Sequence, residues 1–320
     1  VGKLTIVYGD TDSIMFTLEH VSTPEDASDA GAAIAEHVTS KFHARGHLQK
    51  KLDYEKCFKN FILFSKKRYC GIKYEPNGKG GARCLGASHS GTANKRRDSC
   101  AFVHRIYDAM INPLLYESDR TACIEAFHEH VALLLSGQVD YDELVVTKSL
   151  KSDYKNTALP QLRVAAKQRE REAGSEARSG DRLGMIFVRG PPGAKVCDLA
   201  EDADYVKQNR LPIDAVYYLR KQLETPCTSI LELVHPNPAA LFEGYHKEAE
   251  RLRHGTPRLD DFVGGRKAST SSAEHKADAA RLRESVEKRA RVAPTASASK
   301  GKKAKQPVTP SVGIQSFFRS

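Results

Sequence analysis

Two aspartates near the start of the chain, Asp10 and Asp12, have the type and spacing most suited to chemistry. They lie in a short polar break, and Gly9 just before them gives the backbone freedom to bend. Carboxylate oxygens at such an exposed point suit a Mg²⁺ ion that is shared with substrate phosphates, and an ordinary aspartate-rich turn is the alternative. The runs on either side alternate apolar and polar residues like half-buried strands and predict a hairpin, with apolar positions at Leu4, Ile6, Ile14, Phe16 and Leu18.

The segments that follow predict an α+β fold. Apolar residues at helical spacing predict a helix over 27–43, and the glycine-rich, basic segment 75–91 predicts a loop that ends this first part. Alternating residues between them predict strands over 52–59, 61–64 and 66–74. Beyond this loop the periodicity is mainly helical, over 102–114, 121–135, 160–173, 214–223 and 229–234, with one short strand over 185–188.

Positive charge is concentrated at the C-terminal end of the chain. The 320 residues carry a net charge of +10, and residues 264–320 hold 13 Lys and Arg against 4 Asp and Glu. Residues 1–263 hold the other 37 against 36 and are nearly neutral. The basic, Ser/Ala/Lys-rich tail predicts a disordered segment that either tethers DNA or directs nuclear import.

The remaining composition predicts a soluble intracellular protein without a zinc site. Hydrophobic residues make up 40% of the chain, which is enough for one or two cores, and no apolar run is long enough to cross a membrane. The seven cysteines include no Cys-x-x-Cys pair, which favours reduced and mostly buried thiols: Cys57, Cys70, Cys84, Cys100, Cys123, Cys197 and Cys227.

Several short motifs occur in a specific order along the chain. The hairpin carries Tyr8-Gly9-Asp10-Thr11-Asp12-Ser13, and a later segment carries Phe64-Ser65-Lys66-Lys67-Arg68-Tyr69. They are followed by Lys95-Arg96-Arg97-Asp98, Glu143-Leu144-Val145-Val146-Thr147-Lys148, Gly180-Asp181-Arg182, and Leu211-Pro212-Ile213-Asp214 with Tyr217-Tyr218. The first resembles the C motif of family B DNA polymerases and the second the family's lysine-rich motif. The later segments resemble the thumb of the delta-type and large-DNA-virus branch, so the similarity spans 1–232.

This resemblance implies a partial polymerase palm over 1–92, in which a helix crosses an antiparallel sheet. It further implies a mainly helical thumb over 93–255, followed by the disordered tail over 256–320. In the family the second aspartate of the C motif, here Asp12, binds both catalytic Mg²⁺ ions, and Asp10 tunes the site or contacts one ion.

The family's other metal-binding aspartate, its fingers and its exonuclease lie upstream of the matching region. We therefore expect this chain to be the C-terminal piece of a larger protein and to be inactive alone. Asp53 and Glu55 share one strand face, and we expect them to be solvated rather than catalytic.

Two basic runs are candidate DNA contacts. Lys66, Lys67 and Arg68 are consecutive on a predicted strand, so two can reach a duplex while the third pairs within the protein. The resemblance implies that this run, with Tyr69, probes the minor groove of the primer end. Three basic residues before a predicted helix suit phosphate contact from the thumb, although solvated charge is the alternative for both runs: Lys95, Arg96 and Arg97.

Two segments of the tail resemble peptides that bind sliding clamps. Each places an aliphatic residue three positions before a phenylalanine, as in Leu259 and Phe262 or Ile314 and Phe317, and Phe318 adds a second aromatic to the later one. Both lack the usual leading glutamine, so a chance match is the alternative.

We therefore expect part of a replicative DNA-directed DNA polymerase that adds deoxynucleotides to a primer 3′ end by a two-metal mechanism. Its expected partners are primer-template DNA, deoxynucleoside triphosphates and a sliding clamp, in the nucleus or at a site of viral DNA replication. The alternative is a non-catalytic module that binds duplex DNA and tethers a clamp. A different metal-dependent phosphotransferase would explain the hairpin but not the later motifs.

Overall fold

The computed structural model describes residues 3–78, 81–172, 174, 177–191 and 193–254, together with the backbone of 312–319. Backbone contacts divide these residues into two compact units. The first unit contains 3–95, 111–120 and 312–319, and the second contains 96–110 and 121–254. Antiparallel sheets and helices occur in both, so the chain has the mixed α/β character that the sequence predicts.

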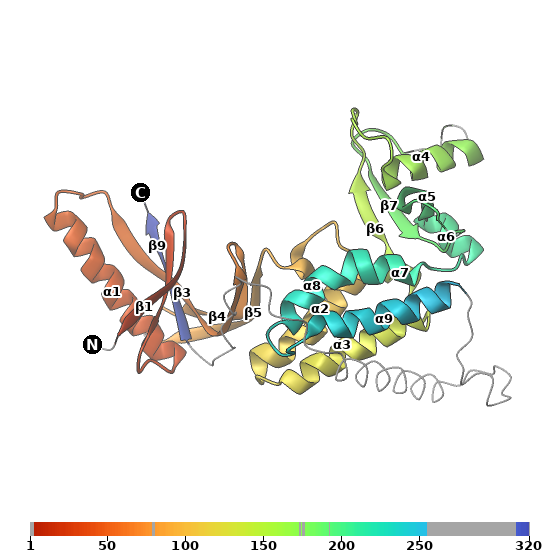
Figure 1. The fold of residues 1–320 in the computed structure, drawn as a ribbon. Helices are drawn as coiled ribbons and strands as arrows, with labels where there is room; N and C mark the ends of the chain where they lie inside the picture. Colours follow the sequence, from red (N-terminus) through yellow and green to blue (C-terminus); the bar gives the residue numbers. More distant parts are fainter. Residues whose placement is uncertain are drawn as a thin grey trace, which may run out of the picture. The chain divides into compact units, whose positions relative to one another are not determined.

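The first unit is built on one antiparallel sheet of six strands in the order β1-β2-β9-β3-β4-β5 (Figure 1). Helix α1 connects β2 to β3, and its N-terminus is capped by Thr23, whose hydroxyl accepts from the Asp26 amide. The elements are β1 Leu4–Asp10, β2 Ser13–Leu18, α1 Pro24–Ala44, β3 Lys51–Ser65, β4 Arg68–Pro76, β5 Ala82–Ser90, the short helix η1 Ala93–Lys95, and β9 Val312–Arg319.

A small core holds α1 against this sheet. Phe16 of β2, Ala27 of α1 and Cys57 of β3 are buried together. Further apolar side chains pack around them and extend the core along the helix: Leu18, Val21, Ile34, Tyr54 and Tyr74. This contact fixes β2, and with it the β1–β2 hairpin, against α1 and the strand that follows it.

The prediction of a loop over 75–91 is wrong, because most of this segment forms strand β5. Its pairing with β4 shifts register where Lys73 pairs with Gly86 and Tyr74 pairs with Cys84. Gly86 has φ +77°, so a glycine absorbs the irregular step as a β-bulge. Glycine in this segment therefore shapes a strand rather than ending the sheet.

The C-terminal tail also differs in part from its prediction. The backbone of β9 lies between β2 and β3 and pairs antiparallel with both, as in Ser13 with Phe317 and Leu52 with Phe318. The second clamp-like segment is therefore extended. The first, with Leu259 and Phe262, lies outside the described residues.

The second unit consists of packed helices and a three-stranded antiparallel sheet, β6-β7-β8. Helix α2 begins in this unit and ends in the first. The elements are α2 Ala101–Tyr116, α3 Arg120–Leu135, η2 Tyr141–Leu144, β6 Val146–Ser149, α4 Pro160–Arg171, β7 Arg182–Phe187, α5 Val196–Leu199, β8 Ala200–Asp202, α6 Ala203–Asn209, α7 Ala215–Tyr217, η3 Tyr218–Leu223, α8 Glu224–Leu231 and α9 Pro238–Arg253.

Aromatic side chains connect α3 to α9 in this unit. The ring of Phe127 lies 5.1 Å from that of Phe242 and 5.7 Å from that of Tyr245, measured between centroids. The buried His128 imidazole forms a hydrogen bond of 2.6 Å between its Nδ1 atom and the Tyr245 hydroxyl. Such edge-on rings add to the stabilisation from burial alone.

Membrane-spanning helices and clustered metal ligands are both absent from the described residues. Every helix among them is too short or too polar to cross a lipid bilayer. The seven cysteines are free thiols, and no group of three or more His, Cys, Asp or Glu side chains among the described residues is placed to hold a metal ion.

The backbone at Gly91 passes very close to the turn between β3 and β4. It has φ +59°, and a Cβ atom at this position would lie 2.2 Å from the Lys67 carbonyl oxygen. Both the backbone conformation and the close approach exclude a side chain. Gly91 therefore sets how closely the chain passes the Lys66–Lys67 turn.

We predict that Gly91→Ala destabilises β4 more than Gly46→Ala does. Both glycines have positive φ, so each substitution costs about 1–2 kcal/mol of left-handed backbone strain. Only Gly91 meets an atom, since nothing lies within 4 Å of a Cβ at Gly46. Native-state hydrogen exchange of the β4 amides measures the difference, and equal effects would contradict the packing role of Gly91.

Candidate functional site

The β1–β2 hairpin presents its two aspartates at the open end. Asp10, the last residue of β1, pairs with Ser13, the first residue of β2, which leaves Thr11 and Asp12 as the turn. Thr11 has φ +56°, so the left-handed residue of the turn is Thr11, whereas the sequence placed the freedom to bend at Gly9. The turn is further held by the Ser13 hydroxyl, which donates to the Asp10 carbonyl at 3.1 Å.

Asp10 forms an ion pair within the protein. The Lys67 ammonium donates to its Oδ1 and Oδ2 atoms at 2.7 and 2.6 Å. The Tyr8 and Thr11 hydroxyls each donate to the same carboxylate at 3.2 Å. The Lys67 ammonium, with these hydroxyls, holds the pKa of the Asp10 carboxyl below its ordinary value, and Asp10 in turn raises the pKa of Lys67.

Asp12 has a different environment. It is exposed in the turn and, among the residues that the structure describes, its carboxylate makes no hydrogen bond or ion pair. The hairpin therefore offers one occupied carboxylate and one available carboxylate, two residues apart. An available, exposed carboxylate is a suitable ligand for a hard cation that arrives with further oxygen ligands.

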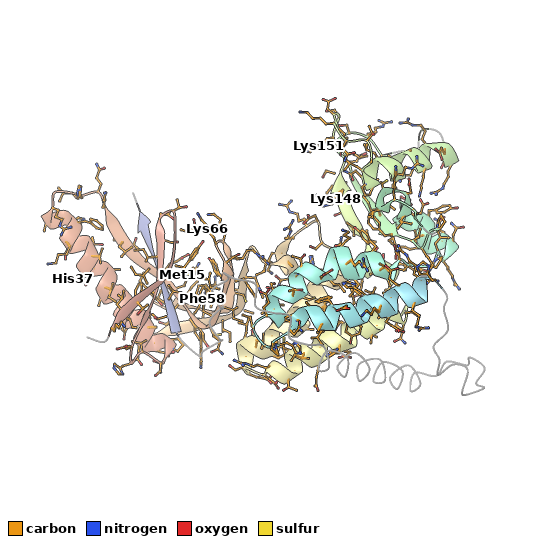
Figure 2. All side chains as sticks on the ribbon, in the orientation of Figure 1. Met15, His37, Phe58, Lys66, Lys148 and Lys151 are labelled. Carbon is orange, nitrogen blue, oxygen red and sulfur yellow. The ribbon has the colours of Figure 1, made fainter. Side chains whose placement is uncertain are left out.

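The lysine-rich run lies in a turn and not on a strand, which corrects the prediction. β3 ends at Ser65 and β4 begins at Arg68, so Lys66 and Lys67 are the two turn residues. Lys67 has φ +61°, a strained conformation for lysine, and its amide donates to the Tyr8 hydroxyl at 2.9 Å. The Lys67 side chain thus turns to Asp10, while the Lys66 side chain (Figure 2) is exposed.

Tyr69 has a packing role at the start of β4. Its ring lies 6.2 Å from the ring of Tyr8, 6.1 Å from that of Phe58 and 5.5 Å from that of Phe61, measured between centroids. These contacts connect β4 to β1 and β3 beside the Asp10–Lys67 pair. The aromatic cluster therefore supports the geometry of the hairpin.

The other acidic candidates on β3 pair with neighbouring lysines. Asp53 lies 2.8 Å from Lys51, and Glu55 lies 3.1 Å from Lys56, measured between nitrogen and oxygen atoms. These pairs fit the solvated strand face that we expected, and pairs of this kind contribute little to stability.

The second basic run divides between the two units. Lys95 ends η1 and is exposed in the first unit, whereas Arg96 and Arg97 begin the second. Arg96 forms two hydrogen bonds of 3.1 Å with the Asp98 carboxylate. The sequence pattern predicted the cations but not this partner, although an aspartate adjacent to an arginine pair is a visible signal.

Comparison with known proteins identifies the family. The model for DNA polymerase family B matches residues 2–234. The chain belongs to DNA polymerase family B. This confirms the resemblance that the ordered motifs indicated.

Curated family B relatives include DNA polymerase delta catalytic subunits. That of Plasmodium falciparum is 34% identical over 244 residues, that of Drosophila melanogaster 33% over 246, and that of rice 31% over 247. The matches cover 75–76% of this chain but only 21–22% of the relatives. This chain therefore spans about a fifth of the length of the polymerases that it matches.

A solved family B polymerase also matches. The enzyme from the hyperthermophilic archaeon Pyrobaculum calidifontis is 23% identical, with a TM-score of 0.46, and the match covers 72% of this chain and 27% of that one.

We predict that Lys67→Gln raises the pKa of Asp10 towards the ordinary aspartate value of about 3.9. In the wild type the lowered pKa contributes stability above the unfolded-state pKa, and this contribution is lost as the pH falls through the folded-state pKa. Lys67→Gln should lack this contribution, so its stability should not show the corresponding decrease as the pH falls through the folded-state pKa of Asp10. Lys66→Gln is the matched control, because it removes the same charge from the same turn without touching Asp10. Carboxyl NMR titration reports both, and an unchanged Asp10 pKa in Lys67→Gln would exclude the ion pair.

Proposed function

We propose that this chain is the C-terminal part of the catalytic subunit of a DNA-directed DNA polymerase, comprising part of the palm and the thumb. One observation carries the proposal: Lys67 occupies Asp10, while Asp12 is exposed at the hairpin tip with an available carboxylate. Membership of DNA polymerase family B supports it. In this proposal the first unit contributes the palm segment and the second unit the thumb.

In this proposal Asp12 is the chief Mg²⁺ ligand that the chain supplies, and Asp10 is its supporting neighbour. Two bound Mg²⁺ ions would activate the primer 3′-hydroxyl and neutralise the charge of the deoxynucleoside triphosphate and its leaving pyrophosphate. Lys67 keeps Asp10 ionised and fixes its orientation, so the turn holds Asp12 at a constant position. Positioning of this kind is the main contribution that a protein makes to phosphoryl transfer.

The chain alone supplies too few ligands for this reaction. No group of three potential metal ligands exists among the described residues, and one of the two hairpin carboxylates is paired with a lysine. The remaining ligand would be an aspartate from outside this chain, shared across the same two ions. We therefore propose that polymerisation requires a larger protein and that the isolated chain is inactive.

Contacts to primer-template DNA would come from both basic runs. Lys66 and Arg68 flank the engaged Lys67 and remain available to the minor groove, where the acceptors of correct base pairs are shared. Lys95, Arg96 and Arg97 would contact phosphates. Tyr69 would hold the Lys66–Lys67 turn in place through its packing against Tyr8. Such a polymerase would work in the nucleus or at a site of viral DNA replication.

A complete polymerase that contains this chain should lose activity when Asp12 is replaced. We predict that Asp12→Asn lowers kcat for nucleotide addition by roughly a thousandfold, the equivalent of several kcal/mol of lost charge stabilisation. Asp10→Asn should cost less, because its direct partner is Lys67. Single-turnover incorporation at saturating primer-template measures both, and Asp53→Asn is the control on the same unit.

The two results that would overturn the proposal differ. Wild-type rates for Asp12→Asn would remove Asp12 from the metal site. A complete wild-type protein that binds primer-template but never extends it would instead support the non-catalytic module that binds DNA and tethers a clamp.

We also propose that the C-terminal segment binds a sliding clamp through Ile314, Phe317 and Phe318. This requires a conformational change, because a clamp-binding peptide forms one helical turn and β9 is extended. The earlier segment with Leu259 and Phe262 is the second candidate.

The double substitution Phe317→Ala and Phe318→Ala should abolish clamp capture in a pull-down and leave duplex affinity unchanged. Ser316→Ala is the matched control, since it lies between the same anchors and removes none of their apolar side chains. Unchanged capture by the double variant would exclude the C-terminal segment as a clamp ligand.

A further inference from the structure

Four cationic residues of the second unit lie in or contact one short loop, residues 96–98. Arg96 and Arg97 lie in the loop before α2, Lys148 lies on β6 (Figure 2), and Arg182 begins β7. Strands β6 and β7 are paired in register, with Ser149 opposite Arg182. The loop 96–98 therefore meets the β6–β7 strand pair near its Ser149–Arg182 end.

The backbone of the loop is held by that ribbon. The Arg97 carbonyl accepts a hydrogen bond from the Thr147 hydroxyl at 3.2 Å and from the Arg182 guanidinium, also at 3.2 Å. Arg182 Nη2 donates to the Thr147 hydroxyl at 2.8 Å, which closes a three-membered network. The carbonyl, and hence the direction of the Arg97 residue, is fixed from two strands.

The carboxylate of Asp98 holds the remaining cations. It accepts hydrogen bonds of 3.1 Å from Arg96 Nε and Nη2, and one of 3.2 Å from Lys148 Nζ. The Arg96 guanidinium first, and then Lys148, hold the pKa of Asp98 well below its ordinary value. Asp98 is therefore ionised at any physiological pH and bridges the loop to β6.

The Arg97 guanidinium takes no part in this hydrogen-bond network. Arg97 is exposed, and its side chain has no hydrogen bond or ion pair with any described residue. Its backbone is fixed while its charge is available. Two of the four cations pair with Asp98, and the loop and the β6–β7 strands together carry more positive than negative charge, which suits a polyanion with regularly spaced phosphates.

We propose that Asp98 is a positioning residue of a phosphate-contact surface that adds Lys148 and Arg182 to Arg96 and Arg97 and receives the backbone of duplex nucleic acid. The inference rests on the proposed DNA-binding function of this chain. Asp98 itself contacts no phosphate. It aligns the cations that do, since without it Arg96 and Lys148 repel each other and the loop loses its ionic contact with Lys148 of β6.

A positioning role for Asp98 and simple charge counting predict opposite effects of Asp98→Asn on the affinity for DNA. Asp98→Asn removes one negative charge, so charge counting predicts tighter binding of DNA. If Asp98 aligns the cations, the same substitution weakens binding because fewer of them reach phosphates together. The matched control is Asp142→Asn, which removes the same charge from an exposed pair with Lys207 in the same unit.

The experiment measures the affinity of the 320-residue chain for a primer-template duplex across a series of salt concentrations. Asp98→Asn should raise the dissociation constant roughly fivefold and reduce the slope of log affinity against log salt by about 1, the loss of one phosphate contact. Asp142→Asn should bind as tightly as the wild type or more tightly. In an Arg97→Ala background the effect of Asp98→Asn should shrink, because the two act on one surface.

Each outcome has one meaning. If Asp98→Asn binds as tightly as Asp142→Asn, the positioning role is wrong and the proposed DNA contacts stand. If the wild type shows no salt-dependent affinity for duplex, the proposed DNA contacts themselves fail. Should Asp98→Asn not fold by circular dichroism, Lys148→Gln tests the pairing from the other side. It should weaken binding more than Lys207→Gln, which removes the same charge from the Asp142 pair, and an equal loss in the two folded variants would reject the proposal.

Discussion

The ion pair between Lys67 and Asp10 is the interaction on which the geometry of the hairpin depends. It connects β1 to the β3–β4 turn, which lie on different sides of α1 in the sequence, and Tyr8 accepts a second bond from the same turn. Lys67 must adopt a positive φ to make these contacts, and Gly91 must lack a side chain to let the turn sit there. The pair therefore occupies one aspartate and leaves its neighbour available to a cation.

The same principle organises the basic runs in both units. In each, a carboxylate of the same unit pairs with one cation of a basic run and leaves other cations of that run without a side-chain partner among the described residues. Asp10 pairs with Lys67 between Lys66 and Arg68, and Asp98 pairs with Arg96 beside Arg97. Clusters of like charge repel one another, so an internal carboxylate lowers that cost while it fixes the positions of the remaining cations.

The sequence predicted the elements whose signals are local. Alternation located β1 and β2, and helical periodicity located α1, α2 and α3 within a few residues of their bounds. The prediction failed at the Lys66–Lys67 turn. The run from Phe61 to Tyr74 contains no Gly, Pro, Asn or Asp before Gly71, and the turn forms through the tertiary contact with Asp10. The sequence also predicted two separate helices over 214–223 and 229–234. In the structure α7, η3 and α8 follow one another without a break, and Pro226 lies in the first turn of α8. The partners of Asp10 and Asp98 lie far away in sequence, and no local pattern reveals such pairing.

The most direct test of the account is where a divalent cation binds on the chain. We would titrate the isotope-labelled protein with trace Mn²⁺ and follow paramagnetic broadening of its amide resonances. We predict that broadening centres on Asp12 and its turn neighbours, because the Asp10 carboxylate is paired with Lys67. Broadening centred on Asp53 and Glu55, or spread evenly over the acidic surface, would contradict it.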